Sequence, residues 1–209
     1  MQPFKRVNGV AAIIPGRNID TDQIIPGRFL KADRSKGYGN FLFHDLRFDA
    51  EGHEKPGFIL NREPFREAPI LVTDDNFGCG SSREGAVYAL QDYGIRALIG
   101  TSFGDIFYSN CLKNGILPVR LDAELMRQLR GLLEGEEGAA IDIDLTALQV
   151  TFPDGSVHAF EVDPFWRTCL LEGVDDLQLT LRHSDQIEGF IADYSRAYPW
   201  AMPKEKAGA

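Results

Sequence analysis

The stretch Asn76-Phe77-Gly78-Cys79-Gly80-Ser81-Ser82-Arg83-Glu84 places two glycines directly before two hydroxyls and a guanidinium. The glycines tolerate positive φ angles and allow a ligand to come close to the backbone. The apolar residues 68–74 precede this stretch and are typical of a buried strand, whereas positions 86, 90 and 93 share one face of a helix that Gly94 ends. We therefore expect a glycine loop at the carboxyl end of a strand and at the start of a helix, where anions are favoured.

The alternation of strands and helices continues along the chain and predicts an α/β fold. Strands are expected at residues 70–73, 96–99 and 117–119, with helices at 83–93 and 105–113 between them. Such an order favours parallel pairing through right-handed crossovers, with ligands bound at the carboxyl edge of the sheet. The other expected elements are strands at 7–14, 141–145, 149–152, 157–162 and 177–181 and helices at 122–134, 164–171 and 185–198.

We expect one domain over residues 1–209, because no repeat or linker divides the sequence. Residues 28–67 form a long connection with little periodicity, which is typical of a functional or mobile segment, and we expect it to gate a substrate site. Its basic side chains, Arg28, Lys31, Arg34 and Lys36, either attract a small dicarboxylate or belong to a solvated loop. Residues 203–209 are expected to fray.

Ser81 has two interpretations from spacing alone. It matches a capping box with Glu84 three positions later, which would make it a helix cap. Alternatively, backbone amides at the helix start and the neighbouring Arg83 stabilise it as a catalytic alkoxide. The stretch matches neither a dinucleotide-binding fingerprint, nor a Walker loop, nor a nucleophile elbow.

Composition excludes several classes of protein. The 209 residues carry a net charge of −9 with a pI of about 4.9, which argues against binding to nucleic acid. The sequence has no apolar run of eighteen residues and no secretion signal at its start, so a cytoplasmic protein is expected. Three cysteines separated by 32 and 58 residues contain no Cys-x-x-Cys pair, and the four histidines lack metal-like spacing. We expect no metal site in this chain.

Three separated blocks of sequence carry a resemblance to a known family. They are Asn18-Ile19-Asp20-Thr21-Asp22-Gln23-Ile24-Ile25-Pro26, the stretch from Asn76 to Glu84, and Ser102-Phe103-Gly104-Asp105-Ile106-Phe107-Tyr108-Ser109-Asn110. In order and spacing they resemble the small subunits of 3-isopropylmalate dehydratase in the aconitase superfamily. The resemblance implies an aconitase-like swivelling domain, a three-layer β/β/α sandwich with a mostly parallel central sheet. It covers nearly the whole chain apart from the last dozen residues.

The resemblance also implies a chemistry. Ser81 matches the serine that removes and returns a proton, Ser82 supports it, and Arg83 matches an arginine that binds a substrate carboxylate. Asp22 matches an acidic residue at the pocket wall, although an Asx turn explains it from spacing alone. The [4Fe-4S] cluster of the family, which supplies the Lewis acid for the departing hydroxyl, belongs to a separate large subunit. The reaction would isomerise 2-isopropylmalate and 3-isopropylmalate through 2-isopropylmaleate in leucine biosynthesis.

Substrate choice is less specified by these blocks. The resemblance makes Leu30 a candidate for contact with the alkyl group of the substrate and Arg34 a candidate for a second carboxylate ligand. Close relatives commonly have histidine where this chain has Gly85. Related enzymes acting on citraconate, 2-methylmalate or homoaconitate therefore remain alternatives, as does a non-catalytic anion-binding regulatory module.

Overall fold

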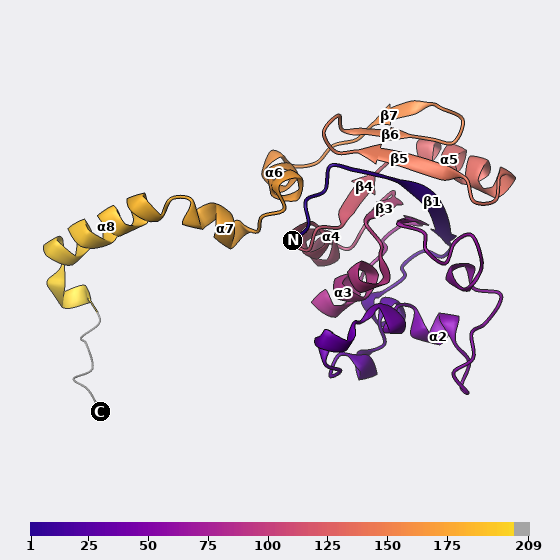
Figure 1. Cartoon of the computed structure of the whole chain (residues 1–209), viewed down its shortest axis with the longest axis horizontal. Helices are drawn as coiled ribbons and strands as arrows, with labels where there is room; N and C mark the ends of the chain where they lie inside the picture. The colour runs from indigo at the N-terminus through magenta and orange to yellow at the C-terminus, as the bar shows by residue number, and fades with distance from the viewer. Residues whose placement is uncertain (203–209) are drawn as a thin grey trace. The chain divides into compact units, whose positions relative to one another are not determined.

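The computed structural model describes residues 1–202, and the tail expected to fray, 203–209, lies outside the described residues. The chain divides into two compact units, residues 1–173 and 174–209. The first contains the sheet and its covering helices, and the described part of the second consists of helices α7 and α8 and a short 3-10 helix (Figure 1). The expectation of one domain over 1–209 stays a prediction.

The first unit is built on a seven-stranded sheet with the order β4-β3-β2-β1-β5-β6-β7. β1 to β4 pair in parallel, whereas β1, β5, β6 and β7 pair antiparallel, so the sheet is mixed. The predicted parallel part is confirmed, and the hairpin of β6 and β7 is also confirmed. The strands are β1 (Arg6–Ile14), β2 (Ile70–Thr73), β3 (Ala97–Gly100), β4 (Leu117–Arg120), β5 (Ala140–Asp144), β6 (Gln149–Thr151) and β7 (Val157–Ala159).

Apolar side chains cover the parallel strands on both faces, as expected for central parallel strands. Along β2, Leu71 belongs to one core and its neighbours Ile70 and Val72 to the other, because successive strand residues point to opposite faces. The first core is closed by α3, α4 and parts of residues 28–67. The second core lies between the other face of the parallel strands and α5, α6 and the antiparallel strands β5 and β6 of the same sheet. Each face of the parallel strands thus packs against a different set of elements (Figure 1).

The helices of the first unit mostly follow the sequence prediction. α3, α4 and α5 occur within two residues of their expected starts, and Gly94 ends α3 in a left-handed conformation. No helix among the described residues is long and apolar enough to cross a bilayer. The α-helices of the first unit are α1 (Thr21–Ile24), α2 (His44–Arg47), α3 (Glu84–Tyr93), α4 (Asp105–Lys113), α5 (Ala123–Gly135) and α6 (Pro164–Glu172).

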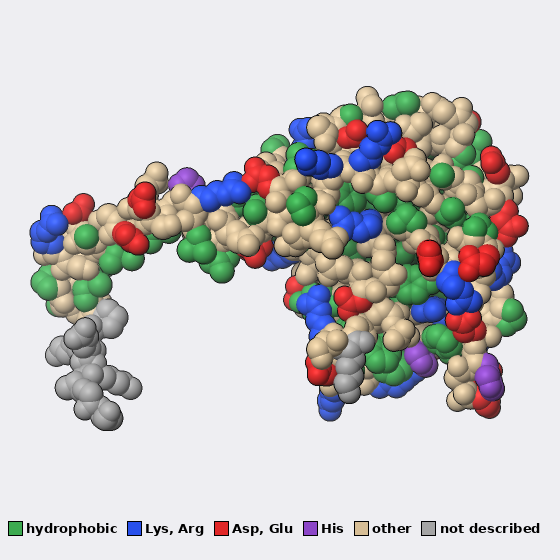
Figure 2. All heavy atoms as spheres, in the orientation of Figure 1, with side chains coloured by type: hydrophobic (Ala, Val, Ile, Leu, Met, Phe, Trp, Pro, Cys, Tyr) green, Lys and Arg blue, Asp and Glu red, His purple; other side chains and the backbone are tan. Residues whose placement is uncertain are grey.

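One predicted element in the second unit is wrong. Residues 177–181 were expected to form a strand, but they belong to helix α7 (Asp176–Leu181). The Asp175 carboxylate accepts a hydrogen bond from the amide of Gln178, and the Gln178 side-chain oxygen accepts one from the amide of Asp175. This capping box starts a helix. Helix α8 (Ser184–Ala197) and the 3-10 helix η5 (Pro199–Ala201) follow, and hydrophobic side chains are exposed along these helices (Figure 2).

The long connection 28–67 is more structured than its sequence suggests. Besides α2 it contains the 3-10 helices η1 (Gly27–Phe29), η2 (Arg34–Lys36), η3 (Gly39–Phe41) and η4 (Ile59–Asn61). Leu42, Phe43, Leu60 and Phe65 are buried in the first core. These side chains anchor the connection to the body of the domain. Its expected gating role and mobility stay predictions.

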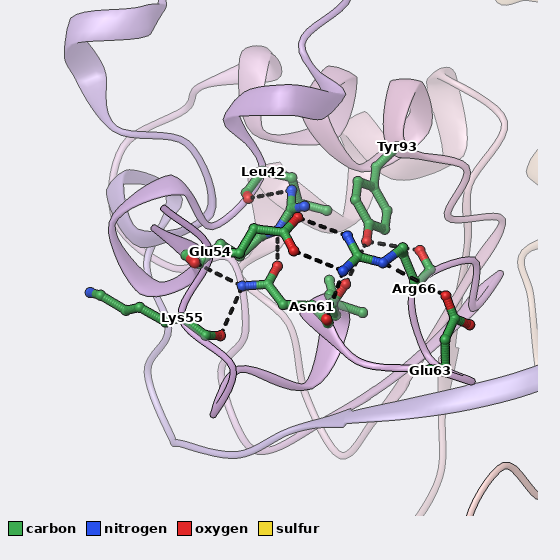
Figure 3. Close-up of polar contacts among 9 residues, drawn as sticks. Leu42, Glu54, Lys55, Asn61, Glu63, Arg66 and Tyr93 are labelled. Atoms are coloured by element: carbon green, nitrogen blue, oxygen red, sulfur yellow. Dashed lines mark hydrogen bonds and ion pairs between the residues drawn. The ribbon is translucent and has the colours of Figure 1, made fainter. Parts of the chain in front are cut away.

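A polar network attaches the end of this connection to α3 (Figure 3). Both terminal nitrogens of Arg66 donate to the Glu54 carboxylate at 2.7 Å, and Arg66 also donates to the carbonyl of Asn61. The Tyr93 hydroxyl, on the last residue of α3, donates to the carbonyls of Arg66 and Leu60 at 2.8 and 3.1 Å. Bidentate guanidinium pairs of this kind are geometrically specific. The network fixes residues 54–66 against the helix whose other end carries Arg83.

Candidate active site

The structure brings the block Asn18–Pro26 and the block Asn76–Glu84 side by side at the carboxyl edge of the sheet. The amide of Gly78 donates to the Ile19 carbonyl at 2.7 Å, and the amide of Thr21 donates to the Cys79 carbonyl at 3.1 Å. These bonds continue the parallel pairing of β1 with β2 beyond the ends of both strands. Asp22 is thereby carried next to the glycine loop, although it is about sixty positions away in sequence.

The third block lies on the other side of the same loop. The amide of Phe77 donates to the Ser102 carbonyl at 3.3 Å, and the amide of Gly104 donates to the Phe77 carbonyl at 2.9 Å. The Ser102 hydroxyl also accepts from the amide of Asn76 at 2.8 Å. Since β2 and β3 are parallel neighbours, their carboxyl ends meet here as predicted. All three blocks therefore form one structural unit.

The glycine loop is tightly packed beneath its exposed end. Gly78 has a φ of +73°, and a Cβ there would lie 2.2 Å from the ring of Phe107 on α4. A Cβ at Gly104 would lie 2.6 Å from the carbonyl oxygen of Gly78. Both positions therefore require glycine so that two backbone segments can approach each other. This contact sets the distance between the loop and the start of α4.

Ser81 is not a helix cap, so that interpretation is wrong. α3 begins at Glu84 with Arg83 in the N-cap position, and no side chain caps it. The Glu84 carboxylate accepts a hydrogen bond from the Asn114 side chain at 3.0 Å, so Glu84 is held by α4. The sequence spacing matched a capping box, but the helix starts too late for Ser81 to reach its first free amides.

The Ser81 backbone is held in place while its hydroxyl is exposed. Its carbonyl accepts from the Arg83 amide at 2.8 Å and from the hydroxyl of the buried Thr21 at 3.1 Å. Among the described residues, the Ser81 hydroxyl has no hydrogen-bond partner. Ser82 is likewise exposed. A fixed backbone with an unengaged hydroxyl is the arrangement expected of a group that acts on a ligand.

Ser81 lines a pocket of about 310 Å³ together with the glycine loop and the first turn of α4. Gly104 occupies the N-cap of α4, and no side chain caps this helix either. The first-turn amides of α4 consequently contribute a partial positive charge to the pocket. The lining residues are Asn76, Gly78, Cys79, Gly80, Ser81, Gly104, Asp105, Ile106 and Phe107.

Arg83 and Asp22, both predicted site residues, are in direct contact. A terminal nitrogen of Arg83 donates to Oδ1 of Asp22, which also accepts from the amide of Gly27 at 3.0 Å. The hydrogen bond from Arg83 lowers the pKa of Asp22, partial burial opposes this, and the Gly27 amide adds to the lowering. The carboxylate is therefore ionised at neutral pH and orients the guanidinium of Arg83, which follows Ser81 by two residues.

Removal of the guanidinium should raise the pKa of Asp22. We expect Arg83→Ala to shift the carboxyl titration of Asp22, measured by carbon-13 NMR, upward toward its ordinary value of about 3.9. Because the folded pKa is lowered, the ion pair stabilises the protein above that pH and is lost as the pH falls through the folded value. Arg28→Ala is the matched control. It should leave Asp22 unchanged and raise the pKa of Asp45, which Arg28 holds at about 2. An unchanged Asp22 titration in Arg83→Ala would contradict the pairing.

Leu30 lies against the start of α3. A Cβ at Gly85 would lie 2.5 Å from Cδ2 of Leu30 and 3.7 Å from the ring of Tyr38. The Tyr38 hydroxyl donates to the Leu30 carbonyl at 3.3 Å. Because Gly85 has no side chain, the Leu30 side chain fills the space beside it. Gly85 follows Arg83 by two residues, so Leu30 packs near the start of α3.

Arg34 is placed further along α3. Its guanidinium lies 3.4 Å from the centre of the Tyr88 ring and donates to the Gln91 side chain at 3.3 Å. Tyr88 and Gln91 follow Arg83 by one to two helical turns, because a turn spans 3.6 residues. The structure brings Ser81, Asp22 and Arg83 together and places Leu30 nearby, whereas Arg34 is engaged on the flank of α3.

The cysteines do not form a cluster site. Cys111 is buried and its pKa is raised by burial, which disfavours the thiolate that a metal requires. Cys79 is half-buried in the loop, and Cys169 is buried in α6. In residues 1–202 no group of three His, Cys, Asp or Glu side chains is arranged to hold a metal ion. The donor set of the described chain therefore does not fit an iron-sulfur cluster.

Other pockets have charged groups that are already engaged. One of about 270 Å³ lies at the carboxyl ends of β2 and β3, where Asp74 pairs with Arg130 and Asp75 pairs with Arg17. Asp74 also accepts a hydrogen bond from the amide of Gly16. These contacts hold helix α5 and the loop that precedes α1 against the end of β2. In contrast, the pocket at Ser81 contains a hydroxyl that has no hydrogen-bond partner among the described residues.

Sequence reasoning missed two contributors to the site. Thr21 was quoted only as part of a motif, yet its buried hydroxyl holds the Ser81 carbonyl. Asp105, quoted only as part of the third block, lines the Ser81 pocket from the first turn of α4. Asp105 follows a glycine at the end of a predicted strand and loop, which was a usable signal. Thr21 offered none, because its contact spans sixty residues.

An α/β domain with a mixed sheet and a polar pocket at its carboxyl edge is typical of a ligand-binding domain. The model of the aconitase C-terminal domain matches residues 1–124, and the LeuD_N model matches residues 127–164. The 3-isopropylmalate dehydratase small subunit of Rhodospirillum centenum is 48% identical over 97% of this chain and 100% of that protein. That of Jannaschia sp. is 49% identical over 96% of this chain and 100% of that protein.

A solved structure agrees with these sequence relatives. The crystal structure of 3-isopropylmalate dehydratase (leuD) from Methanocaldococcus jannaschii superposes with a TM-score of 0.64 at 26% identity, covering 88% of this chain and 99% of that one. The chain belongs to the family of 3-isopropylmalate dehydratase small subunits, which are aconitase-type hydro-lyase subunits. The predicted resemblance and fold class are confirmed.

Proposed function

We propose that this chain is the small subunit of an enzyme that interconverts 2-isopropylmalate and 3-isopropylmalate by dehydration and rehydration through 2-isopropylmaleate, in leucine biosynthesis. The observation that carries the proposal is the exposed Ser81 hydroxyl in a pocket at the uncapped start of α4, two residues before the Arg83 that pairs with Asp22. The names of the relatives support the same substrate. A cytoplasmic location fits such an enzyme and is part of the proposal.

Ser81 is assigned to the proton transfer. The substrate proton lies on a carbon next to a carboxylate, so its removal builds negative charge that needs stabilisation. The amides at the starts of α3 and α4 and the Arg83 guanidinium favour an anion near Ser81, which lowers the free energy of the alkoxide relative to the alcohol. Ser82, exposed next to Ser81, is assigned to substrate binding. No side-chain base contacts Ser81 among residues 1–202, so the activation is electrostatic.

Arg83 is assigned to a substrate carboxylate. Asp22 occupies one terminal nitrogen of its guanidinium, and the planar fork presents further donors that suit a carboxylate. Asp22 thus fixes the orientation of Arg83 at the pocket wall. For Arg34 we retain a weaker role as a second carboxylate ligand, which requires it to leave Tyr88 and Gln91 when substrate binds.

The departure of the substrate hydroxyl requires a group that this chain does not provide, because its described donors do not fit a cluster. We assign the [4Fe-4S] cluster to a large subunit, which the naming of the relatives as small subunits implies as a partner. The chain is then inactive alone and active as part of a complex. Residues 28–67 are assigned to gating of the shared site.

The test is reconstitution with a cluster-loaded large subunit of 3-isopropylmalate dehydratase. Isopropylmalate should yield the unsaturated diacid, detected by ultraviolet absorbance, only when both subunits are present. Citraconate, 2-methylmalate and homoaconitate substrates, run in parallel, decide between this substrate and those of related enzymes. Tight binding of dicarboxylates by the isolated chain, with no turnover of any substrate by the complex, would instead support a regulatory anion-binding module.

Leu30 should control the alkyl preference. We expect Leu30→Ala to reduce kcat/KM for isopropylmalate relative to 2-methylmalate by about tenfold, since contacts of one to a few methylene groups discriminate by roughly 10 to 200-fold. Leu46→Ala, another half-exposed leucine of the same connection, is the matched control and should leave the ratio unchanged. If the ratio of kcat/KM for isopropylmalate to kcat/KM for 2-methylmalate were the same in both variants, Leu30 would not contact the alkyl group of the substrate.

A further inference from the structure

The second unit exposes a continuous set of large apolar side chains. Neither α7, α8 nor η5 contains a buried residue. The exposed fraction reaches 66% at Phe190 and 82% at Trp200. We call this set the arm face; it comprises Leu177, Leu181, Ile187, Phe190, Ile191, Tyr194, Tyr198 and Trp200.

The side chains of the arm face are arranged regularly along α8, as in a helix that binds a partner. In α8 its members recur every three to four residues and form one stripe, while Asp185, Glu188, Asp193 and Arg196 lie on the opposite side of the helix. The rings of Phe190 and Tyr194 stack with centres 5.6 Å apart, and those of Tyr194 and Tyr198 are 5.0 Å apart. Aromatic side chains of this kind dominate the binding energy of protein interfaces.

Such a face needs a cover. A helix of fourteen residues is marginal in water on its own, and most helical stability in proteins comes from packing of the apolar side. Contiguous exposed apolar patches of this kind mark interaction sites. The regular amphipathic pattern of α8 is therefore explained by a partner that buries it.

We propose that the arm face binds the cluster-bearing large subunit, an inference that rests on the function proposed above. The family models match residues no further than 164. The described part of the second unit, residues 174–202, which we call the arm, is therefore not needed to define the aconitase-type domain. The small subunit of Rhodospirillum centenum nevertheless aligns over all but 3% of this chain, so the alignment extends through the arm. The arm is thus part of a two-subunit enzyme rather than of the domain alone.

Charge disfavours a second copy of this chain as the occupant. Residues 174–202 carry five acidic side chains, Asp175, Asp176, Asp185, Glu188 and Asp193, against two arginines, Arg182 and Arg196. Two arms packed against each other would bring like charges together. A groove of the large subunit that is apolar at its floor and basic at its rim fits this face better.

The experiment compares full-length variants in complex formation with the large subunit. Phe190→Ala with Ile191→Ala removes the centre of the arm face, and Gln186→Ala with Glu188→Ala is the matched control on the polar side of the same helix. Alanine preserves helix propensity in both. We expect the first variant to bind the large subunit more weakly, with a dissociation constant, measured by calorimetry, at least tenfold higher than that of wild type. The large-subunit concentration needed for half-maximal activity should rise in parallel, with kcat at saturation unchanged. The control should stay within twofold of wild type.

Each other outcome overturns the proposal. Unchanged affinity in the apolar variant shows that the large subunit binds elsewhere. A wild-type dimer that the variant dissociates, seen by light scattering, identifies a second copy as the occupant, and a lowered Tm of the isolated variant shows that the arm covers its own chain. If wild type itself forms no active complex, the proposed function fails; if wild type is active and the variant assembles normally, only the arm proposal fails.

Discussion

Ser81→Ala should reduce the kcat of the reconstituted enzyme by about 10²- to 10⁴-fold, the range in which a positioned acid or base contributes to catalysis. The substitution should slow only the catalytic step and leave folding and assembly unchanged. Ser81 is exposed, and the two contacts that hold it involve its carbonyl, which alanine retains. Complex formation and thermal stability should therefore equal those of wild type. The measurement is the initial rate of formation of the unsaturated diacid at saturating isopropylmalate.

Ser82→Ala is the matched control, since it removes an equally exposed hydroxyl one residue away. It should change KM more than kcat, because Ser82 is assigned to substrate binding. A Ser81→Ala enzyme with wild-type kcat would contradict the assignment of the proton to this hydroxyl. A variant that no longer assembles would instead show that the Ser81 loop belongs to the subunit interface.

The sequence specified the parallel part of the fold because local pattern and tertiary environment agree there. β2 and β3 are short apolar runs, and burial on both faces requires that composition. Gly94 ended α3 as expected, since its φ of +110° suits glycine. The strand expected at residues 177–181 is wrong because a capping box formed by Asp175 and Gln178 starts a helix there.

The site was only partly predictable from sequence. The family resemblance made Ser81, Asp22 and Arg83 the expected site residues, but spacing alone left Ser81 a possible helix cap, and the start of α3 at Glu84, which Asn114 contacts from thirty residues away, was not readable from it. The complementarity of Leu30 and Gly85 likewise depends on how residues 28–67 fold onto α3. Such contacts join segments distant in sequence and leave no periodic signal.

Gly78→Ala should cause a large loss of stability. A non-glycine residue at the observed φ of +73° costs about 1–2 kcal/mol. The new methyl group would lie 2.2 Å from the ring of Phe107, whose side chain is buried, so the ring and α4 must shift, and overpacking of this kind costs about 1–3 kcal/mol more. We expect urea denaturation to show a free energy of unfolding lower by about 2–5 kcal/mol.

Gly80→Ala separates the two contributions. Gly80 has a similar φ of +88°, but a Cβ there would meet only the Asp20 Cβ at an ordinary 3.5 Å. This variant should lose only the backbone term of about 1–2 kcal/mol. Equal losses in the two variants would show that Phe107 yields freely and that the loop is not fixed by α4. A larger loss in Gly78→Ala, accompanied by reduced kcat in the folded fraction, would show that the contact between the loop and α4 also sets the position of Ser81.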